Sequence, residues 1–158
     1  MNSTSPYASY VNTIRKSVGS MIWNCHYVRQ ELPNVAISSD AEAHLLEILD
    51  DLEGALYDIR CELRNLEDEL GLRPYHPPRH PNIFNPDPRI TIELIREPLS
   101  DKMPALEFIE QRLREESDSQ GKALACLLVS ESANNLREDH QAISHALDHL
   151  MSNLRQMN

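Results

Sequence analysis

Glycine is scarce in this chain, with four residues among 158. None of them lies in a GxGxxG, GxxxxGK or GxSxG pattern. Those patterns build the phosphate-binding loops of nucleotide-binding folds and the nucleophile turn of the α/β-hydrolases. The zinc motif HExxH and the repeated Glu-x-x-His of di-iron bundles are missing as well. We therefore predict that the protein is not an enzyme, with no catalytic residue and no cofactor.

Aromatic residues are also few, at 5% of the chain, and the lysines and arginines do not cluster. Proteins that bind nucleic acid directly carry a basic patch, and those that bind single strands add stacking aromatic side chains. The one dense charge block of this sequence is acidic, so it repels phosphates. The sequence therefore predicts no direct binding to nucleic acid.

Three cysteines, at positions 25, 61 and 126, form no CxxC pair. An odd number of cysteines without such a pair favours reduced thiols in a reducing compartment. No run of about 18 apolar residues is present, so we expect no membrane span. Residues 1–10 are rich in serine and lack the basic start and apolar core of a secretory signal. The predicted location is the cytoplasm.

The stretch from Ser39 to Gly71 has the clearest pattern. Its apolar residues alternate in steps of four and three: Leu45, Leu49, Leu52, Leu56, Ile59, Leu63, Leu66 and Leu70. This heptad pattern predicts a long helix with a narrow apolar seam for another helix. Ser39 with Glu42 has the spacing of a capping box at the start. Gly71 can adopt the left-handed conformation that ends a helix.

The same stretch carries most of the negative charge. Between residues 40 and 70 there are eleven acidic residues against two arginines, which accounts for nine of the ten net negative charges. One interpretation is a solvated helix face that keeps the protein soluble. The other is an interface that attracts a basic surface over a Debye length of about 8–10 Å. The residues expected to form that interface are Glu47, Asp50, Asp51, Glu53, Asp58 and Glu62.

A second heptad precedes this one. Its members are Tyr7, Val11, Ile14, Val18, Met21, Cys25, Val28 and Leu32. Because only residues 34–38 separate the two heptads, the helices should fold back as an antiparallel hairpin over 1–71. The first helix has further apolar side chains outside its seam: Tyr10, Ile22, Trp23 and Tyr27. A helix with more than one apolar stripe is buried on more than one side, or it faces a second chain.

Six prolines between residues 72 and 88 preclude a continuous helix there. We therefore predict a Pro-rich crossover over 72–99. Within it, residues 89–95 alternate in the manner of a short strand, whereas Asp87-Pro88 is a helix start. We favour the helix, because a strand needs a partner and no second strand is visible.

Residues 100–158 are predicted to form the C-terminal helices. A shorter helix begins at Ser100 or Asp101, and a long one runs from about residue 122 to 156 with a third heptad seam. The predicted fold is thus all-α, a single domain over 1–158 in the form of a coiled-coil-like helical bundle. Since its apolar seams exceed what one hairpin can cover, we also predict a homodimer.

Three histidines in the last predicted helix are candidate functional residues. His145 and His149 lie one helical turn apart, a spacing at which two imidazoles can share a transition metal. Both lie outside the apolar seam, and only Asp148 or a residue from another helix offers a third ligand, so they are weak metal candidates. His140 occupies a seam position, where we predict a buried histidine with a hydrogen-bond partner. The alternative for His140 is a pH switch.

Taken together, these patterns favour a non-enzymatic binding protein, an inhibitor or regulator. Its acidic helix would dock on a basic surface of a partner protein, for example a site that binds nucleic acid. The first alternative is a homo-oligomeric scaffold, in which the acidic residues only maintain solubility. The second is a metal-dependent helical enzyme that uses His145 and His149.

Overall fold

The computed structural model describes residues 6–35, 38–72, 87–120 and 124–156, and all of their regular structure is helical. The elements are α1 (Ala8–Glu31), the 3₁₀ turn η1 (Leu32–Asn34), α2 (Ser39–Glu69), α3 (Pro88–Asp101), α4 (Met103–Gln120) and α5 (Leu124–Gln156). The predicted all-α bundle is confirmed. The alternative of a strand at 89–95 is wrong, because these residues lie in α3. Half of the predicted Pro-rich crossover, residues 73–86, lies outside the described ranges. Its last part, residues 88–99, is not a crossover but belongs to α3, because Asp87 and Pro88 start a helix there.

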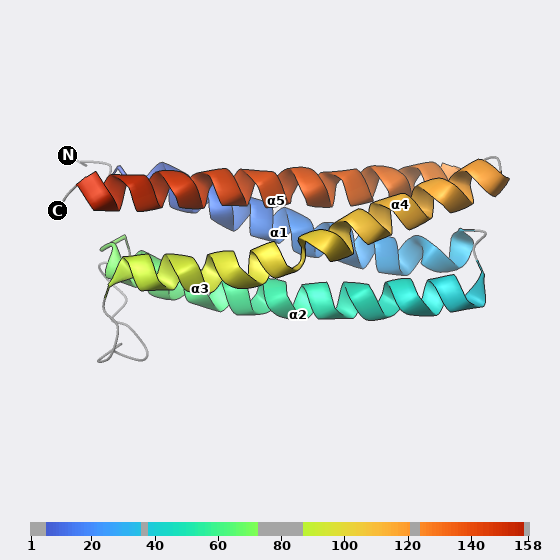
Figure 1. Cartoon of the computed structure of the whole chain (residues 1–158), viewed down its shortest axis with the longest axis horizontal. Helices are drawn as coiled ribbons and strands as arrows, with labels where there is room; N and C mark the ends of the chain where they lie inside the picture. Colours follow the sequence, from blue (N-terminus) through green and yellow to red (C-terminus); the bar gives the residue numbers. More distant parts are fainter. Residues whose placement is uncertain (1–5, 36–37, 73–86, 121–123, 157–158) are drawn as a thin grey trace.

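The helices form a bundle of four antiparallel columns (Figure 1). The first column is α1, the second is α2, the third is α3 followed by α4, and the fourth is α5. Each column packs against two neighbours: α1 lies between α2 and α5, and α3 likewise contacts both α2 and α5. This is the up-down-up-down topology of four-helix bundles. None of the described helices is long and apolar enough to span a membrane.

Helix α1 is buried on two sides, as its extra apolar residues predict. It packs against α2, as expected for the hairpin, but its contact with α5 is more extensive. One aromatic residue departs from the pattern, since Trp23 is 62% exposed. The apolar seams form one continuous core. The eight seam residues from Leu45 to Leu70 are buried or half-buried, and the described seam of α5 is buried from Val129 to Leu150.

The two ends of α2 are fixed by local hydrogen bonds. The N-cap is Ser38, whose Oγ accepts a hydrogen bond of 3.2 Å from the amide of Ala41. The predicted cap, Ser39, is instead the first helical residue, and both serines have the side chain that a cap needs. At the other end, Gly71 has φ +72° and the amide of Leu72 donates to the carbonyl of Glu67. This is the predicted left-handed glycine end, in the form of a Schellman motif.

Proline chemistry explains the break between α3 and α4. Helix α3 begins at Pro88 after the cap Asp87, whose carboxylate accepts from the amide of Arg89 at 3.0 Å. It ends at Asp101, and α4 starts two residues later with Pro104 in its first turn. Because proline has no amide hydrogen, a continuous helix through this point would lose a hydrogen bond. The column therefore bends here (Figure 1).

Candidate functional site: an acidic groove beside α2

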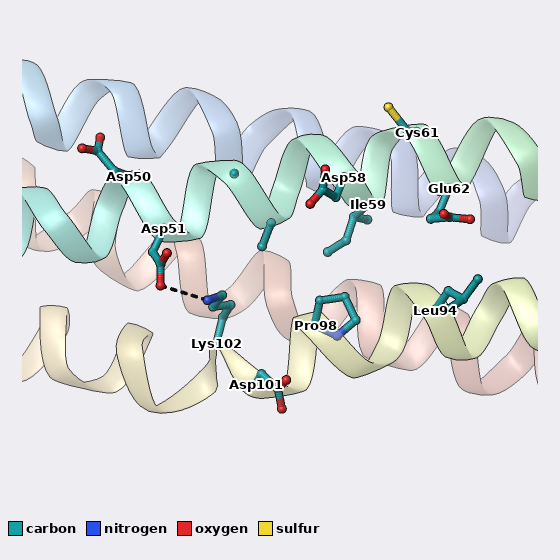
Figure 2. Close-up of a pocket in the computed structure, with 12 residues that line it drawn as sticks. Asp50, Asp51, Asp58, Ile59, Cys61, Glu62, Leu94, Pro98, Asp101 and Lys102 are labelled. Carbon is teal, nitrogen blue, oxygen red and sulfur yellow. Dashed lines mark hydrogen bonds and ion pairs between the residues drawn. The ribbon is translucent and has the colours of Figure 1, made fainter.

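A groove of about 700 Å³ runs between α2 and the α3–α4 column (Figure 2). It is lined from α2 by Asp50, Asp51, Gly54, Ala55, Asp58, Ile59, Cys61 and Glu62, and from the facing column by Leu94, Pro98, Asp101 and Lys102. The close spacing of its α2 residues follows from helix geometry, since residues three and four apart share a face. The groove is thus formed by one side of the acidic helix α2 and by residues of α3 and of its junction with α4.

The charge of the groove is strongly negative. Five carboxylates line it, at positions 50, 51, 58, 62 and 101, against the single cation Lys102. Lys102 Nζ lies 3.2 Å from Asp51 Oδ2, and this ion pair bridges the groove (Figure 2). Within the described residues, Asp58 and Asp101 make no ion pair, and Glu62 accepts only from the side-chain amide of Asn65 on its own helix. The groove therefore has carboxylates available for a basic ligand.

The floor and far wall of the groove are apolar. Gly54 and Ala55 form the floor on the α2 side, and their small size leaves the groove open. No neighbouring side chain among the described residues lies within 4 Å of the position that a Cβ on Gly54 would occupy. Leu94, 47% exposed, forms the opposite wall with Pro98 (Figure 2). A ligand that offered cations to the rim could therefore also bury apolar surface. Such a mixed surface is typical of protein interfaces, which have an apolar centre and a polar edge.

The structure places four of the six predicted acidic residues at this groove: Asp50, Asp51, Asp58 and Glu62. Glu47 is on α2 outside the lining. Asp50 stands at the edge nearest α1, where its Oδ1 lies 2.6 Å from Arg29. The predicted residues thus do not form one continuous face, because the helix distributes them over two sides.

Glu53, the sixth predicted residue, lies on the other side of α2, where it is buried against α1. Its side chain is 10% exposed, and its Oε1 lies 2.5 Å from the Arg29 guanidinium. His26 Nε2 is 3.5 Å from the other carboxylate oxygen. Two heptads further on, the buried Glu67 pairs with Arg15 of α1 in the same way. We therefore leave Glu53 out of the proposed interface, since its carboxylate serves the contact between helices.

Compared with known protein families, curated proteins and solved structures, the chain matches none.

The histidine pair remains a weak metal candidate. His145 and His149 are both exposed on α5, and the ring of His149 stacks on Tyr10 with centroids 5.2 Å apart. Within the part of the chain that the structure describes, no group of three or more histidine, cysteine or carboxylate side chains is arranged to hold a metal ion. A site with two histidines alone falls short of the ligand number that zinc requires.

The described thiols fall into two classes. Cys25 is buried in the α1 seam, and burial, followed by the nearby Glu53 carboxylate, raises its pKa to about 12, although Arg29 opposes the shift. A thiol in this state is unreactive near neutral pH, because the thiolate is the nucleophile. Cys61 is exposed and lines the acidic groove. The side chain of Cys126 lies outside the described part of the structure.

A polar chain crosses the interface between α1 and α5. The Asn24 amide donates to the Ser20 carbonyl at 2.8 Å and approaches the Ser20 hydroxyl at 3.3 Å. Asp139 of α5 lies close to the same Ser20 hydroxyl. Burial raises the pKa of Asp139, and the neighbouring Glu138 carboxylate adds to the shift, while the Ser20 hydrogen bond opposes it. The carboxyl group therefore holds its proton more tightly in the folded chain than in the unfolded one.

This raised pKa gives a prediction for Asp139→Asn. A carboxyl whose pKa is higher in the folded state contributes stability at low pH, and that contribution is lost as the pH rises from its unfolded value, near 3.8, through its folded value. The asparagine amide carries no charge at any pH, and its oxygen can still accept from Ser20. We expect the variant to be more stable than the parent at neutral pH, by less than about 1 kcal/mol because the site is half-exposed.

The measurement is urea unfolding at a series of pH values. The difference between the two proteins should disappear at the acidic end of the series, below the unfolded pKa of Asp139. A variant equally stabilised at every pH would show that the carboxyl is not the cause. Glu131→Gln on the exposed side of α5 provides the control, and its stability should follow that of the parent throughout.

The sequence predicts the acidic wall of the groove but not its other wall. It assigns Leu94, Pro98, Asp101 and Lys102 to a crossover or to a helix start, without a partner. One signal for α3 is present, because its buried residues Thr91, Ile92, Ile95 and Leu99 have helical spacing. No signal in the sequence places this helix beside α2, because the segment that joins them is long and rich in proline.

Proposed function

We propose that the protein is a non-enzymatic binding protein whose acidic groove, between α2 and the α3–α4 column, receives a basic segment of a partner protein. The observation that supports this most is the pairing of an excess of carboxylates with an apolar wall in one groove. A lysine- or arginine-rich helix with one apolar side would place its cations on Asp58 and Glu62 and its apolar side on Leu94. Such a partner could itself be a nucleic-acid-binding protein, whose phosphate site the carboxylates would occupy.

The neutral double variant Asp58→Asn/Glu62→Gln tests this proposal. Neither residue makes an ion pair within the described part of the chain, so the fold should be unaffected by their loss. We expect the variant to bind a basic partner at least about tenfold more weakly and to show a smaller dependence on salt, since two of the groove charges are removed. The partner is sought by affinity capture from lysate of the native host, with washes at low and high salt.

The matched control is Glu107→Gln/Glu131→Gln. It makes the same change in net charge at exposed positions of α4 and α5 that lie outside the groove. If both double variants lose the captured partner to the same extent, binding depends on net charge and the groove is not its site. Retention of the partner by Asp58→Asn/Glu62→Gln would also contradict the proposal.

The alternative of a homo-oligomeric scaffold is favoured by one observation. Ile90 and Leu94 are both exposed on α3 and lie four residues apart, so they present a small apolar face on one side of the helix. A second copy that packed there would bury both. Sedimentation equilibrium of the parent and of Leu94→Arg distinguishes this function from the first: a dimer that becomes a monomer in the variant supports the scaffold, and a parent that is monomeric at all concentrations excludes it.

A further inference from the structure

A second groove lies on the opposite side of α2, against α1, and its chemistry differs from that of the acidic groove. It measures about 440 Å³, and its walls include Val18, Gly19, Ile22 and Leu63. No neighbouring side chain among the described residues lies within 4 Å of the position that a Cβ on Gly19 would occupy, so the groove is open at that point. A bound backbone could therefore approach α1 closely here. The function proposed for the acidic groove plays no part in this site.

An exposed tryptophan stands at the edge of this second groove. Trp23 is 62% exposed, and the chain has few other aromatic residues. Its ring stacks on Tyr27, with centroids 5.4 Å apart and planes inclined by 13°. Tyr57, one turn before Arg60 on the neighbouring helix, is exposed as well. Because the stack already restrains the indole, it can act as an anchor for a ligand at a small cost in entropy.

Most of the lysines and arginines around this groove have no ion-pair or hydrogen-bond partner among the described residues. Among the described lysines and arginines, four make no ion pair or hydrogen bond: Lys16, Arg60, Arg64 and Arg155. Three of these four line the groove or lie next to it. Arg60 lines it, Arg64 follows one helical turn later, and Lys16 precedes Trp23 by two turns on the same side of α1. The surface is therefore positive in a chain whose net charge is −10.

The other two basic residues of the groove do not change this balance, since Arg15 is paired with Glu67, and His26 lies beside Glu53. A ligand with carboxylates would meet Lys16, Arg60 and Arg64 without having to displace an internal partner among the described residues. The charge thus favours an acidic ligand, and the apolar floor with Trp23 favours one that also carries an apolar side chain.

A second copy of this chain fits the groove poorly. A two-fold dimer places the same patch of each subunit against the other, which would bring these unpaired cations together. The acidic groove of a second copy has the right charge, but that contact joins two different surfaces and leaves one of each kind open on every subunit. A different protein with an acidic, amphipathic segment satisfies the groove directly.

We propose that the α1–α2 groove is a docking surface for an acidic amphipathic segment of another protein. An apolar side chain of that segment lies beside Trp23, and its carboxylates face the unpaired lysine and arginines. This is an interaction of the same general kind as a helix laid in a groove, with the charges set to select an acidic helix.

Trp23 is the only tryptophan of the chain, so its fluorescence reports on this groove alone. The probe is a synthetic helical peptide without tryptophan or tyrosine, in which two leucines four residues apart face one side and glutamates occupy the rest. We expect the emission of Trp23 to shift to shorter wavelength as the peptide is added, because the indole becomes buried. The same peptide with lysines in place of the glutamates should produce no shift.

Charge reversal at one rim residue tests the assignment. Arg60→Glu should weaken peptide binding by about tenfold, since an attraction is replaced by a repulsion. Arg155→Glu makes the same change in net charge at the end of α5 and should leave binding unchanged. Neither arginine bonds to another described residue of the chain, so both variants should fold, which circular dichroism verifies.

Four results would overturn the proposal. The first is no shift of Trp23 emission up to about 1 mM acidic peptide, because a specific contact of this size should bind with a dissociation constant below that concentration. The second is an equal response to the lysine peptide, and the third is an equal loss in Arg155→Glu. The fourth is a shift obtained without the peptide, either from phosphatidylserine vesicles or from raising the protein concentration alone, which would identify a membrane or a second copy as the ligand.

Discussion

Replacing Arg29 by methionine should destabilise the protein by about 2–3 kcal/mol. The guanidinium neutralises Glu53 at 2.5 Å and Asp50 at 2.6 Å. Without it, the nearly buried Glu53 carboxylate keeps only His26 as a basic neighbour among the described residues, and an uncompensated buried charge is costly. The value lies below that for a fully buried pair, because Arg29 is itself partly exposed to solvent. Urea unfolding followed by circular dichroism measures the change.

Two controls separate the buried charge from a general loss of ion pairs. The double variant Arg29→Met/Glu53→Met should recover most of the lost stability, since no orphaned charge remains. Lys102→Met removes the partner of Asp51, whose side chain is 78% exposed, and should cost less than about 1 kcal/mol. If Arg29→Met were no more harmful than Lys102→Met, the pair between α1 and α2 would be only a surface ion pair.

The second large effect is expected at His140, the polar residue in the α5 seam. Its Nε2 lies 2.8 Å from the Leu99 carbonyl oxygen, close to the end of α3. Since a carbonyl only accepts, this nitrogen must carry the proton. His140→Ala should cost about 2–3 kcal/mol, because it removes the hydrogen bond and leaves a cavity in the core. The prediction of a buried histidine with a hydrogen-bond partner is confirmed. Unfolding in urea measures how much this residue contributes to the stability of the fold.

His140→Leu divides the effect into its two parts. The leucine fills most of the space but cannot donate to Leu99, whose carbonyl still accepts from the amide of Lys102 at 3.2 Å. We therefore expect a loss of only about 1 kcal/mol. The same variant tests the pH-switch alternative between about pH 5 and 8. A stability that varies with pH as the parent's does would exclude the switch, and a loss equal to that of His140→Ala would show that packing is unimportant at this site.

The helices themselves are predictable from the sequence, because their signals are local. The seam of α2 repeats without interruption, and Gly71 and the serines at 38 and 39 mark its ends within one residue. The choice between helix and strand at 89–95 also follows from a local signal, the Asp87-Pro88 start. Alternation of Ile90 and Ile92 favours a strand, but the helical spacing of the buried residues prevails.

The arrangement of the helices is less predictable, because it depends on contacts between distant segments. The main partner of α1 is α5, which follows it by more than 90 residues in the chain. Glu53 shows how this affects the site. Its charge suggests exposure, yet it stands next to the seam, as does Glu67 two heptads later. Arg15 and Arg29 have the same separation on α1, and this matching spacing is the available signal for two buried pairs.

The stacking of Tyr10 on His149 brings the start of α1 beside the end of α5. Both ends of the folded helical unit therefore leave from one pole of the bundle (Figure 1). A linker could join them to make a circular permutant, with new termini at the opposite pole between α1 and α2. Domains fused to the two ends would likewise be held close to each other, at a distance from the middle of α2.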